Sequence, residues 1–199
     1  MKKGYFLKLS LSLGLLALSA LMLHWAGAAH ETLHLPAGTD PVLTRLPLVD
    51  ATPLLSWGWL LFNAAALAAA CAYERPRLPY LIATVALFAA IRNVFIVITP
   101  VGPPLGLIKL YNGDFLSPLR GSIFSDEELF FSGHTGLPFL YYLMFRRPPG
   151  FREFCLFFSC LMAVAVLLTR NHYAIDALGA FFTTYSIHAL SLRLFEAKA

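Results

Sequence analysis

Long apolar stretches dominate this chain and restrict what it can fold into. A membrane-spanning helix needs about 20 mostly apolar residues. Six stretches meet or nearly meet that length: 5–29, 53–73, 78–99, 129–145, 154–169 and 173–194. The fourth and fifth are short and contain polar or small residues. The sequence therefore predicts an all-α, polytopic membrane protein, a six-transmembrane-helix bundle that makes up one domain over residues 1–199.

The composition agrees with that class. Of the 199 residues, 58% are hydrophobic and only 13% are charged, and the mean hydropathy is +0.68. No ordinary soluble domain is so apolar. The net charge of +4 does not indicate nucleic-acid binding, because the basic residues cluster between the apolar segments. Membrane lipids are the expected partners, and a homo-oligomer stays open.

No metal or cofactor is expected. Cys71, Cys155 and Cys160 all lie within predicted spans and have neither disulfide nor metal-ligand spacing. They are interpreted as small packing residues. His30 and His34 are four residues apart, as helical metal ligands can be. Their position at the end of an apolar run instead favours a solvated boundary.

The basic residues set the orientation of the bundle. Ten of them lie on one side of the six-span arrangement and four on the other, with Arg92 inside the third span. This predicts cytoplasmic termini and puts His134 and His172 on the non-cytoplasmic face. As an alternative, residues 1–29 resemble a signal peptide, with lysines before an apolar stretch that ends in small residues. Its removal would leave five spans and move neither histidine.

One short polar segment runs from Arg170 to Asp176. It places His172 and Asp176 four residues apart, on one face of a helix. A carboxylate bound to one imidazole nitrogen raises the basicity of the other, which suits a general base or a nucleophile. Arg170 lies at the outer end of this segment, where a guanidinium can bind phosphate oxygens. The alternative is a set of interfacial capping residues, but ionisable groups inside spans are usually functional.

A second segment is Ser132-Gly133-His134-Thr135. Ser132 is a natural helix cap, and free amides near Gly133 and His134 favour an anion. His134 could donate a proton to a departing oxygen. Alone, this segment is weak evidence, because an ordinary capped helix start looks the same. Together, the two segments predict a metal-free phosphoryl-transfer site.

An acidic run, Asp126-Glu127-Glu128, precedes the second segment. Such residues fit the first turn of a helix, where they interact favourably with the helix dipole. They also fit a site for the ammonium of a choline or ethanolamine headgroup, assisted by aromatic side chains. Both interpretations stay open, and under the second Glu128 binds the headgroup.

Taken together, these segments resemble the sphingomyelin synthase branch of the type 2 phosphatidic acid phosphatase superfamily. The resemblance rests on Ser132-Gly133-His134-Thr135, on His172-Tyr173-Ala174-Ile175-Asp176, and on Arg92-Asn93-Val94-Phe95-Ile96-Val97-Ile98-Thr99-Pro100, with Tyr185 and Arg193 in the last span. It runs from about residue 78 to the C-terminus, and the six-span plan extends it to the whole chain.

The resemblance implies an enzyme of lipid and sphingolipid metabolism with a ping-pong mechanism. By analogy, His172 attacks the phosphorus of a phospholipid, Asp176 orients His172, and His134 protonates the leaving diacylglycerol oxygen. A lipid hydroxyl, of ceramide or diacylglycerol type, then takes the phospho-headgroup from His172. The residues expected to bind the phosphate or headgroup are Arg170, Ser132, Gly133, Arg92 and Glu128.

Two departures from the family pattern bear on the reaction. The phosphatase branch has an arginine six residues before its nucleophilic histidine, where this chain has Val166. This difference favours transfer over plain hydrolysis. The synthase branch reads Cys-Gly-Asp upstream, where this chain has Glu128 in place of the aspartate. The alternatives are a lipid phosphate phosphatase or phospholipase C-like hydrolase and, less favoured, a non-catalytic lipid-binding membrane protein.

Overall fold

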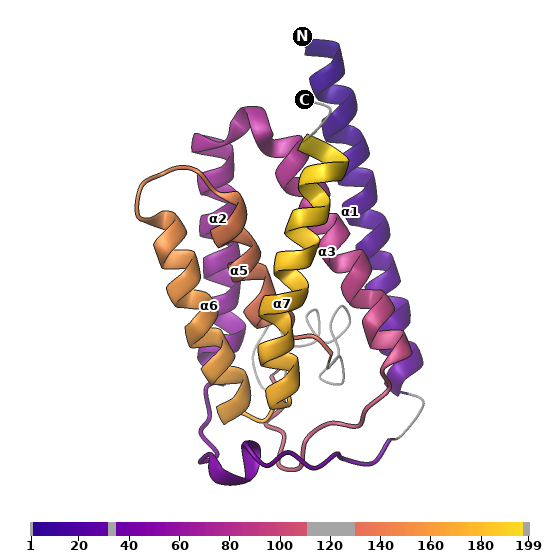
Figure 1. The fold of residues 1–199 in the computed structure, drawn as a ribbon, viewed down its shortest axis with the longest axis vertical. Helices are drawn as coiled ribbons and strands as arrows, with labels where there is room; N and C mark the ends of the chain where they lie inside the picture. Colours follow the sequence, from indigo (N-terminus) through magenta and orange to yellow (C-terminus); the bar gives the residue numbers. More distant parts are fainter. Residues whose placement is uncertain (1, 32–34, 111–129, 197–199) are drawn as a thin grey trace.

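A computed structural model of the chain describes residues 2–31, 35–110 and 130–196 (Figure 1). Within these residues the fold is all-helical, as predicted, with an isolated β-bridge but no β-strand. The α-helices are α1 (Lys2–Glu31), α2 (Trp59–Tyr73), α3 (Leu78–Ile98), α5 (Gly133–Met144), α6 (Phe151–Leu168) and α7 (Ala174–Ser191). Short 3-10 and π-helical turns are Leu43–Arg45, Leu54–Gly58, Arg75–Arg77 and Leu192–Glu196.

Helices that could cross a membrane account for much of the chain. In the described residues four segments are long and apolar enough: Gly4–Trp25, Leu54–Tyr73, Arg75–Ile98 and Phe151–Leu168. The chain is accordingly an integral membrane protein. Two further helices, α5 and α7, lie over predicted spans but are not long and apolar enough to be included. α5 has 12 residues, about 18 Å at 1.5 Å per residue, and α7 carries Asp176, His188 and several hydroxyl side chains among its apolar residues.

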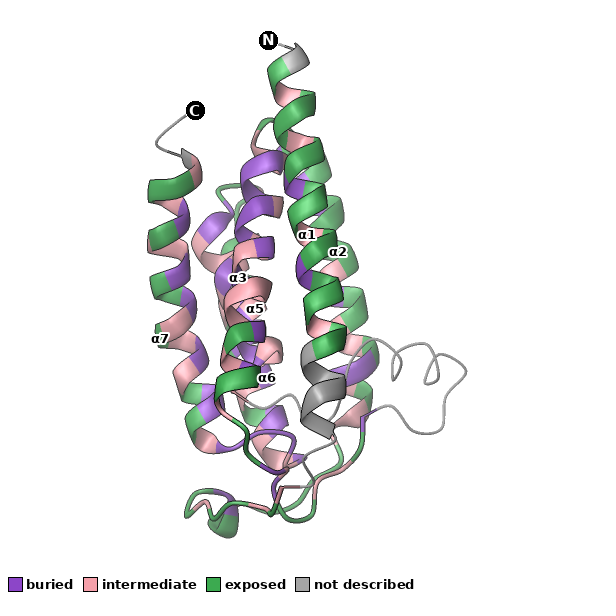
Figure 2. Cartoon of the chain, turned by 90° about the vertical axis from the view of Figure 1, so that its right-hand side faces the viewer, coloured by how far each residue is buried: buried purple, intermediate pink, exposed green. Residues whose placement is uncertain are grey.

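α1 lies at the edge of the bundle, alongside α3 (Figure 1). Ser12 Oγ donates a hydrogen bond to the Pro79 carbonyl (2.8 Å), and Asn93 Nδ2 donates one to the Ser19 carbonyl (2.7 Å). Such polar contacts between spanning helices help to hold them together. Most of the other α1 side chains are exposed (Figure 2) and apolar, so in a membrane they face lipid.

α5 is the central helix, packed against α6 and α7 and also touching α3. Gly136 allows the close approach: a Cβ at this position would lie 2.8 Å from Thr184 Oγ1 and 2.9 Å from Phe88. Small residues serve this purpose widely in membrane helices. A second core cluster joins α2 and α6, where the rings of Phe62 and Phe158 stack with their centroids 4.1 Å apart.

At the end of the bundle that holds both termini, the buried carboxylate of Glu74 connects two turns (Figure 1). One carboxylate oxygen accepts a hydrogen bond from Arg77 Nη1 (2.9 Å). The other accepts from the amides of Arg146 (2.7 Å) and Arg147 (2.9 Å). Hydrogen bonds to an ionised group are stronger than neutral ones. The turn after α2 and the turn after α5 are thus joined by one side chain.

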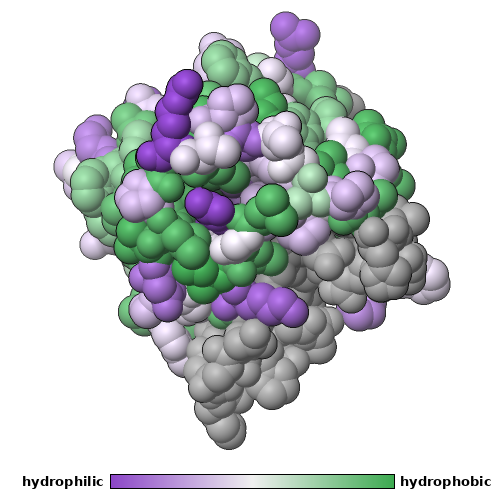
Figure 3. Space-filling model, turned by 90° about the horizontal axis from the view of Figure 1, so that it is seen from below, coloured by the Kyte–Doolittle hydropathy of each residue, from purple (hydrophilic) through white to green (hydrophobic). Residues whose placement is uncertain are grey.

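At the opposite end, two loops interlock with the start of α7. The Tyr173 hydroxyl accepts a hydrogen bond from the Gly38 amide (2.7 Å) and donates one to the Gly102 carbonyl (2.8 Å). Asp40 Oδ2 accepts from the Ala174 amide (2.7 Å). Seen from this end, hydrophilic and hydrophobic residues are interspersed (Figure 3). These contacts position the start of α7, where Asp176 lies in the first turn and His172 lies just before the helix.

Candidate active site

The two polar segments identified in the sequence meet in the structure. The Ser132 amide donates a hydrogen bond to the Asp176 carbonyl (3.1 Å), which ties the start of α5 to the first turn of α7. Ser132 is 0% and Asp176 is 2% exposed. This hydrogen bond brings the segment that contains His134 against the segment that contains His172 and Asp176.

His172 and Asp176 are paired, but they do not share a helix face as their spacing predicts, because α7 begins at Ala174 and His172 precedes it. His172 Nδ1 lies 3.5 Å from Asp176 Oδ2, and both side chains are buried. This distance is longer than a good hydrogen bond, and the structure gives the buried His172 Nδ1 no closer partner among the described residues. Asp176 Oδ2 also accepts from the Tyr173 amide (2.9 Å), which fixes the carboxylate. Nε2 is then the nitrogen of His172 that faces away from the carboxylate.

The His134 ring contacts α2 and the turn that precedes α2. Its Nε2 lies 3.2 Å from the Leu55 carbonyl oxygen, and its ring centroid lies 4.8 Å from that of Trp59. A carbonyl oxygen can only accept a hydrogen bond, so this contact requires a proton on His134 Nε2. In the neutral ring the lone pair is then on Nδ1. This nitrogen is the one that can gain and lose a proton.

The Leu55 carbonyl is presented by the π-helical turn Leu54–Gly58. The Trp59 amide bonds to the Leu54 carbonyl, five residues back, where an α-helix uses four. Such turns are rare and are often found at functional sites. Sequence reasoning missed Leu55 and Trp59 as site residues. Any residue offers a carbonyl, and an apolar pattern does not distinguish a π-helical turn from an α-helix.

Arg92 of α3 lies against the start of α5. Its Nε donates a hydrogen bond to the Phe131 carbonyl (2.9 Å), and a Cβ at Gly133 would lie 3.3 Å from the same Nε. Ser132 caps α5 as predicted, its hydroxyl accepting from the Thr135 amide (3.3 Å). The glycine therefore leaves room for the guanidinium beside a helix start, a combination that favours an anion.

Arg170 follows α6 in a left-handed conformation, with φ of 56°. Its amide donates to the Leu167 carbonyl (3.1 Å) and the Asn171 amide donates to the Val166 carbonyl (2.9 Å), which are the two bonds of a Schellman motif. Glycine usually takes this position, since other residues lose about 1 kcal/mol there. Arg170 Nη1 donates to the Leu105 carbonyl (2.8 Å), so the side chain lies along the 100–110 loop.

Arg92 and Asp176 give the described site one fixed charge of each sign. Arg92 lies against the start of α5 through its hydrogen bond to the Phe131 carbonyl, and Asp176 is the carboxylate paired with His172. A guanidinium beside the free amides of a helix start suits a negatively charged ligand such as a phosphate group. Glu128, the expected headgroup ligand, lies in 111–129, outside the described residues.

Several other residues of the predicted span 173–194 do not join this site. Tyr185 and Arg193 are exposed and lie further along the chain, toward the opposite end of the bundle. His188 Nδ1 lies 3.4 Å from the Tyr80 hydroxyl, a contact between α7 and α3. In the part of the chain that the structure describes, no group of three or more potential metal ligands occurs.

Comparisons with protein-family models, with curated proteins and with solved structures found no match to this chain. Its class, an integral membrane protein, follows from its helices. Its function has to be argued from the geometry of the site.

Proposed function

We propose that this chain is a membrane phosphotransferase of the sphingomyelin synthase type. It moves a phospho-headgroup from a phospholipid to a lipid hydroxyl, of ceramide or diacylglycerol type, through a phosphohistidine. The observation that carries the proposal is the hydrogen bond between the Ser132 amide and the Asp176 carbonyl. This bond joins the segment that contains His134 to the segment that contains His172, beside Arg92.

The first half-reaction breaks a phosphorus–oxygen bond in the donor lipid. His172 Nε2 attacks the phosphorus, while Asp176 orients the ring and stabilises its positive charge. The bond to the diacylglycerol oxygen breaks, and its electron pair stays on that oxygen. Protonated His134 supplies the proton that neutralises it, from Nδ1. Arg92 and the amides at the start of α5 stabilise the phosphate oxygens.

The second half-reaction restores the enzyme. A lipid hydroxyl attacks the phosphorus of phosphorylated His172, and the phosphorus–nitrogen bond breaks with its electrons returning to Nε2. His134 Nδ1 takes the hydroxyl proton. Each cycle thus leaves both histidines as they began. The contact between His134 Nε2 and the Leu55 carbonyl holds the ring for both proton transfers.

Burial supports a lipid acceptor over water. His172 is 4% and Asp176 is 2% exposed, and exclusion of water protects a reactive intermediate from hydrolysis. The positions of the basic residues support six spans, cytoplasmic termini and a site on the non-cytoplasmic face. α5 would then be a short span, completed by residues outside its 12-residue helix.

The direct test uses membranes from cells that express the full-length chain. A phospholipid labelled in its headgroup phosphate is supplied with a lipid alcohol, and the labelled products are separated into lipid and water-soluble fractions. We expect label in a new lipid. His172→Ala should lower turnover by roughly 10³-fold or more, and His134→Ala by roughly 10²–10⁴-fold.

His24→Ala is the matched control, because His24 is an exposed histidine on α1. It should leave turnover unchanged. Label found only in water-soluble phosphate or phospho-headgroup would identify a hydrolase and overturn transfer. Unchanged lipid turnover in both His172→Ala and Asp176→Asn would overturn the enzyme proposal as a whole.

A further inference from the structure

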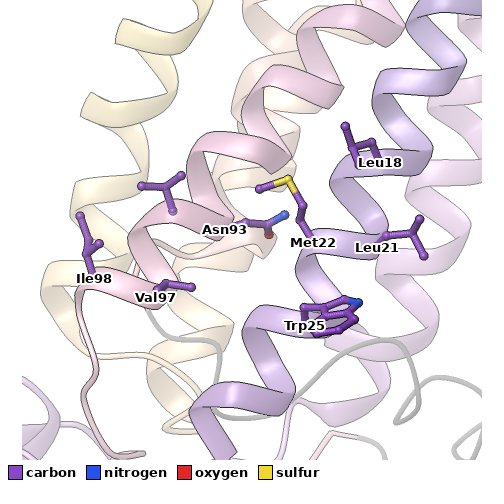
Figure 4. Close-up of a pocket in the computed structure, with 8 residues that line it drawn as sticks. Leu18, Leu21, Met22, Trp25, Asn93, Val97 and Ile98 are labelled. Atoms are coloured by element: carbon purple, nitrogen blue, oxygen red, sulfur yellow. The ribbon is translucent and has the colours of Figure 1, made fainter.

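A groove between α1 and α3 lies outside the site described above. It has a volume of about 630 Å³ and is lined by seven apolar side chains and Asn93: Leu18, Leu21, Met22, Trp25, Val94, Val97 and Ile98. Figure 4 shows Asn93 and Met22 pointing toward each other from the two facing helices. The volume is within the range of small-molecule sites.

The groove faces the surroundings of the bundle. Leu18, Leu21 and Val97 are between 55% and 62% exposed, and they belong to two helices that are long and apolar enough to cross a membrane. In a membrane, lipid therefore has direct access to the groove. Because the walls are almost entirely apolar, a hydrocarbon chain is the ligand that fits them.

Asn93 gives the groove a single specific polar group. The residue is 2% exposed, and its Nδ2 donates a hydrogen bond to the Ser19 carbonyl (2.7 Å). Its Oδ1 is buried and accepts no hydrogen bond from the described residues. Leaving such an acceptor unpaired costs about 1–3 kcal/mol. A ligand that supplies one donor at this depth would recover that free energy.

We propose that the groove binds a membrane lipid alcohol, with its hydrocarbon along the apolar walls and its hydroxyl donating to Asn93 Oδ1. A hydroxyl matches the site because it brings one donor. A lipid amide would bring a carbonyl as well, which the apolar lining cannot satisfy. This binding site is independent of phosphoryl transfer, since it is built from α1 and the face of α3 that contacts α1.

The test uses the purified full-length chain in lipid nanodiscs and two photoreactive probes. One is a long-chain alcohol with a diazirine in its chain, and the other is its methyl ether, which lacks the donor. After irradiation, labelled peptides are mapped by mass spectrometry. We expect the alcohol to label α1 and α3 around residues 18–25 and 93–98, at least about fivefold more than the ether, a difference of about 1 kcal/mol.

Variants separate the groove from the general lipid-facing surface. Val97→Trp fills the groove and should remove most of the labelling by the alcohol. Leu67→Trp, at an exposed apolar position of α2 outside the groove, should not. Asn93→Leu should reduce labelling by the alcohol to the level of the ether. His172→Ala should leave labelling intact, so loss of catalysis and loss of this site are distinguishable.

Three results would overturn the proposal. Equal labelling by the alcohol and the ether in the unmodified chain would show that Asn93 selects nothing, and this comparison needs no variant to fold. Labelling confined to other helices would place the lipid elsewhere. Disulfide cross-links between two copies of the chain that carry Trp25→Cys and Val97→Cys would assign the groove to a dimer contact.

Discussion

At the scale of single residues, little space is left around the guanidinium of Arg92 at the start of α5. Gly133 shows this most directly, because a Cβ there would lie 3.3 Å from Arg92 Nε. Arg92 in turn donates to the Phe131 carbonyl. A side chain at position 133 would therefore have to displace the guanidinium from the start of α5.

Gly133→Ala tests this arrangement. Alanine favours helix more than glycine does, so the variant should unfold at the same temperature or slightly higher. Turnover should fall by roughly tenfold to a hundredfold, because displacing a positioned group by about 1 Å costs that much. Gly14→Ala is the control, since a Cβ at Gly14 meets nothing within 4 Å. Equal turnover in both variants would contradict the role assigned to Arg92.

Arg170 lies in a left-handed conformation that glycine adopts without cost. Arg170→Gly and Arg170→Ala both lose the hydrogen bond to the Leu105 carbonyl, but only the alanine keeps the backbone strain. Arg170→Gly should therefore be more stable than Arg170→Ala by about 1 kcal/mol. Thermal unfolding in detergent measures this difference. If Arg170 binds substrate phosphate, both variants lose turnover alike. Normal turnover in Arg170→Gly would limit Arg170 to holding the loop.

Sequence predicts the site residues that act through their side chains better than those that act through the backbone. His134, His172 and Asp176 are side chains with distinctive chemistry and spacing, so their pattern indicated a site. The Leu55 carbonyl has no residue signature. The direction of Arg170 depends on a left-handed backbone that sequence did not indicate, because glycine is the residue expected there.

At the scale of elements, the N-terminus of α7 depends on a residue far away in sequence. Asp40 accepts hydrogen bonds from the amides of Ala174, Val42 and Leu43. Partial burial would raise the pKa of its carboxyl, but these three hydrogen bonds outweigh burial and hold the pKa below its usual value of 3.8. The ionised carboxylate thereby stabilises the helix start that bears Asp176.

The pH dependence of stability follows from that lowered pKa. Ionised Asp40 stabilises the fold above the unfolded pKa of 3.8, and this stabilisation is lost as pH falls from about 4 through the lower folded pKa. Asp40→Ala should cost about 1 kcal/mol at pH 7 and should flatten the loss of stability below about pH 4. Thr39→Ala, at the exposed neighbouring position, should do neither. An unchanged acid profile in Asp40→Ala would contradict this role of Asp40.

The helices themselves were largely predictable, because apolar length is a strong signal. The exception is the predicted span 129–145, over which α5 covers only Gly133–Met144. It starts at Gly133 because Ser132 caps it, and it ends where the Arg146 and Arg147 amides bond to Glu74. Hydropathy detects the apolar run and does not register such end contacts.

At the scale of the whole molecule, the two ends of the bundle differ in what they carry. Both termini lie at the end with Glu74, and the 35–50 and 100–110 loops lie at the other end (Figure 1). The proposed topology therefore puts Leu48 on the non-cytoplasmic side of the membrane and Pro149 in the cytoplasm. Both residues are exposed and uncharged, so replacing either one leaves the charges that set orientation untouched.

Cysteine labelling checks this orientation. In a chain whose own cysteines are replaced by alanine, Leu48→Cys should react with a membrane-impermeant maleimide on intact cells. Pro149→Cys should react only after permeabilisation. The chain without cysteine is the control for background labelling. The reverse pattern would put the site on the cytoplasmic face.

The Glu74 junction also bears on how the chain is assembled during synthesis. Glu74 and its partner amide at Arg146 are 72 residues apart in the sequence. At roughly 5–20 residues added per second, the ribosome makes Glu74 several seconds before that partner exists. In that interval, Arg77 is the neighbour with which Glu74 can pair. The contact that joins the turn after α2 to the turn after α5 can therefore form only once both turns have been synthesised.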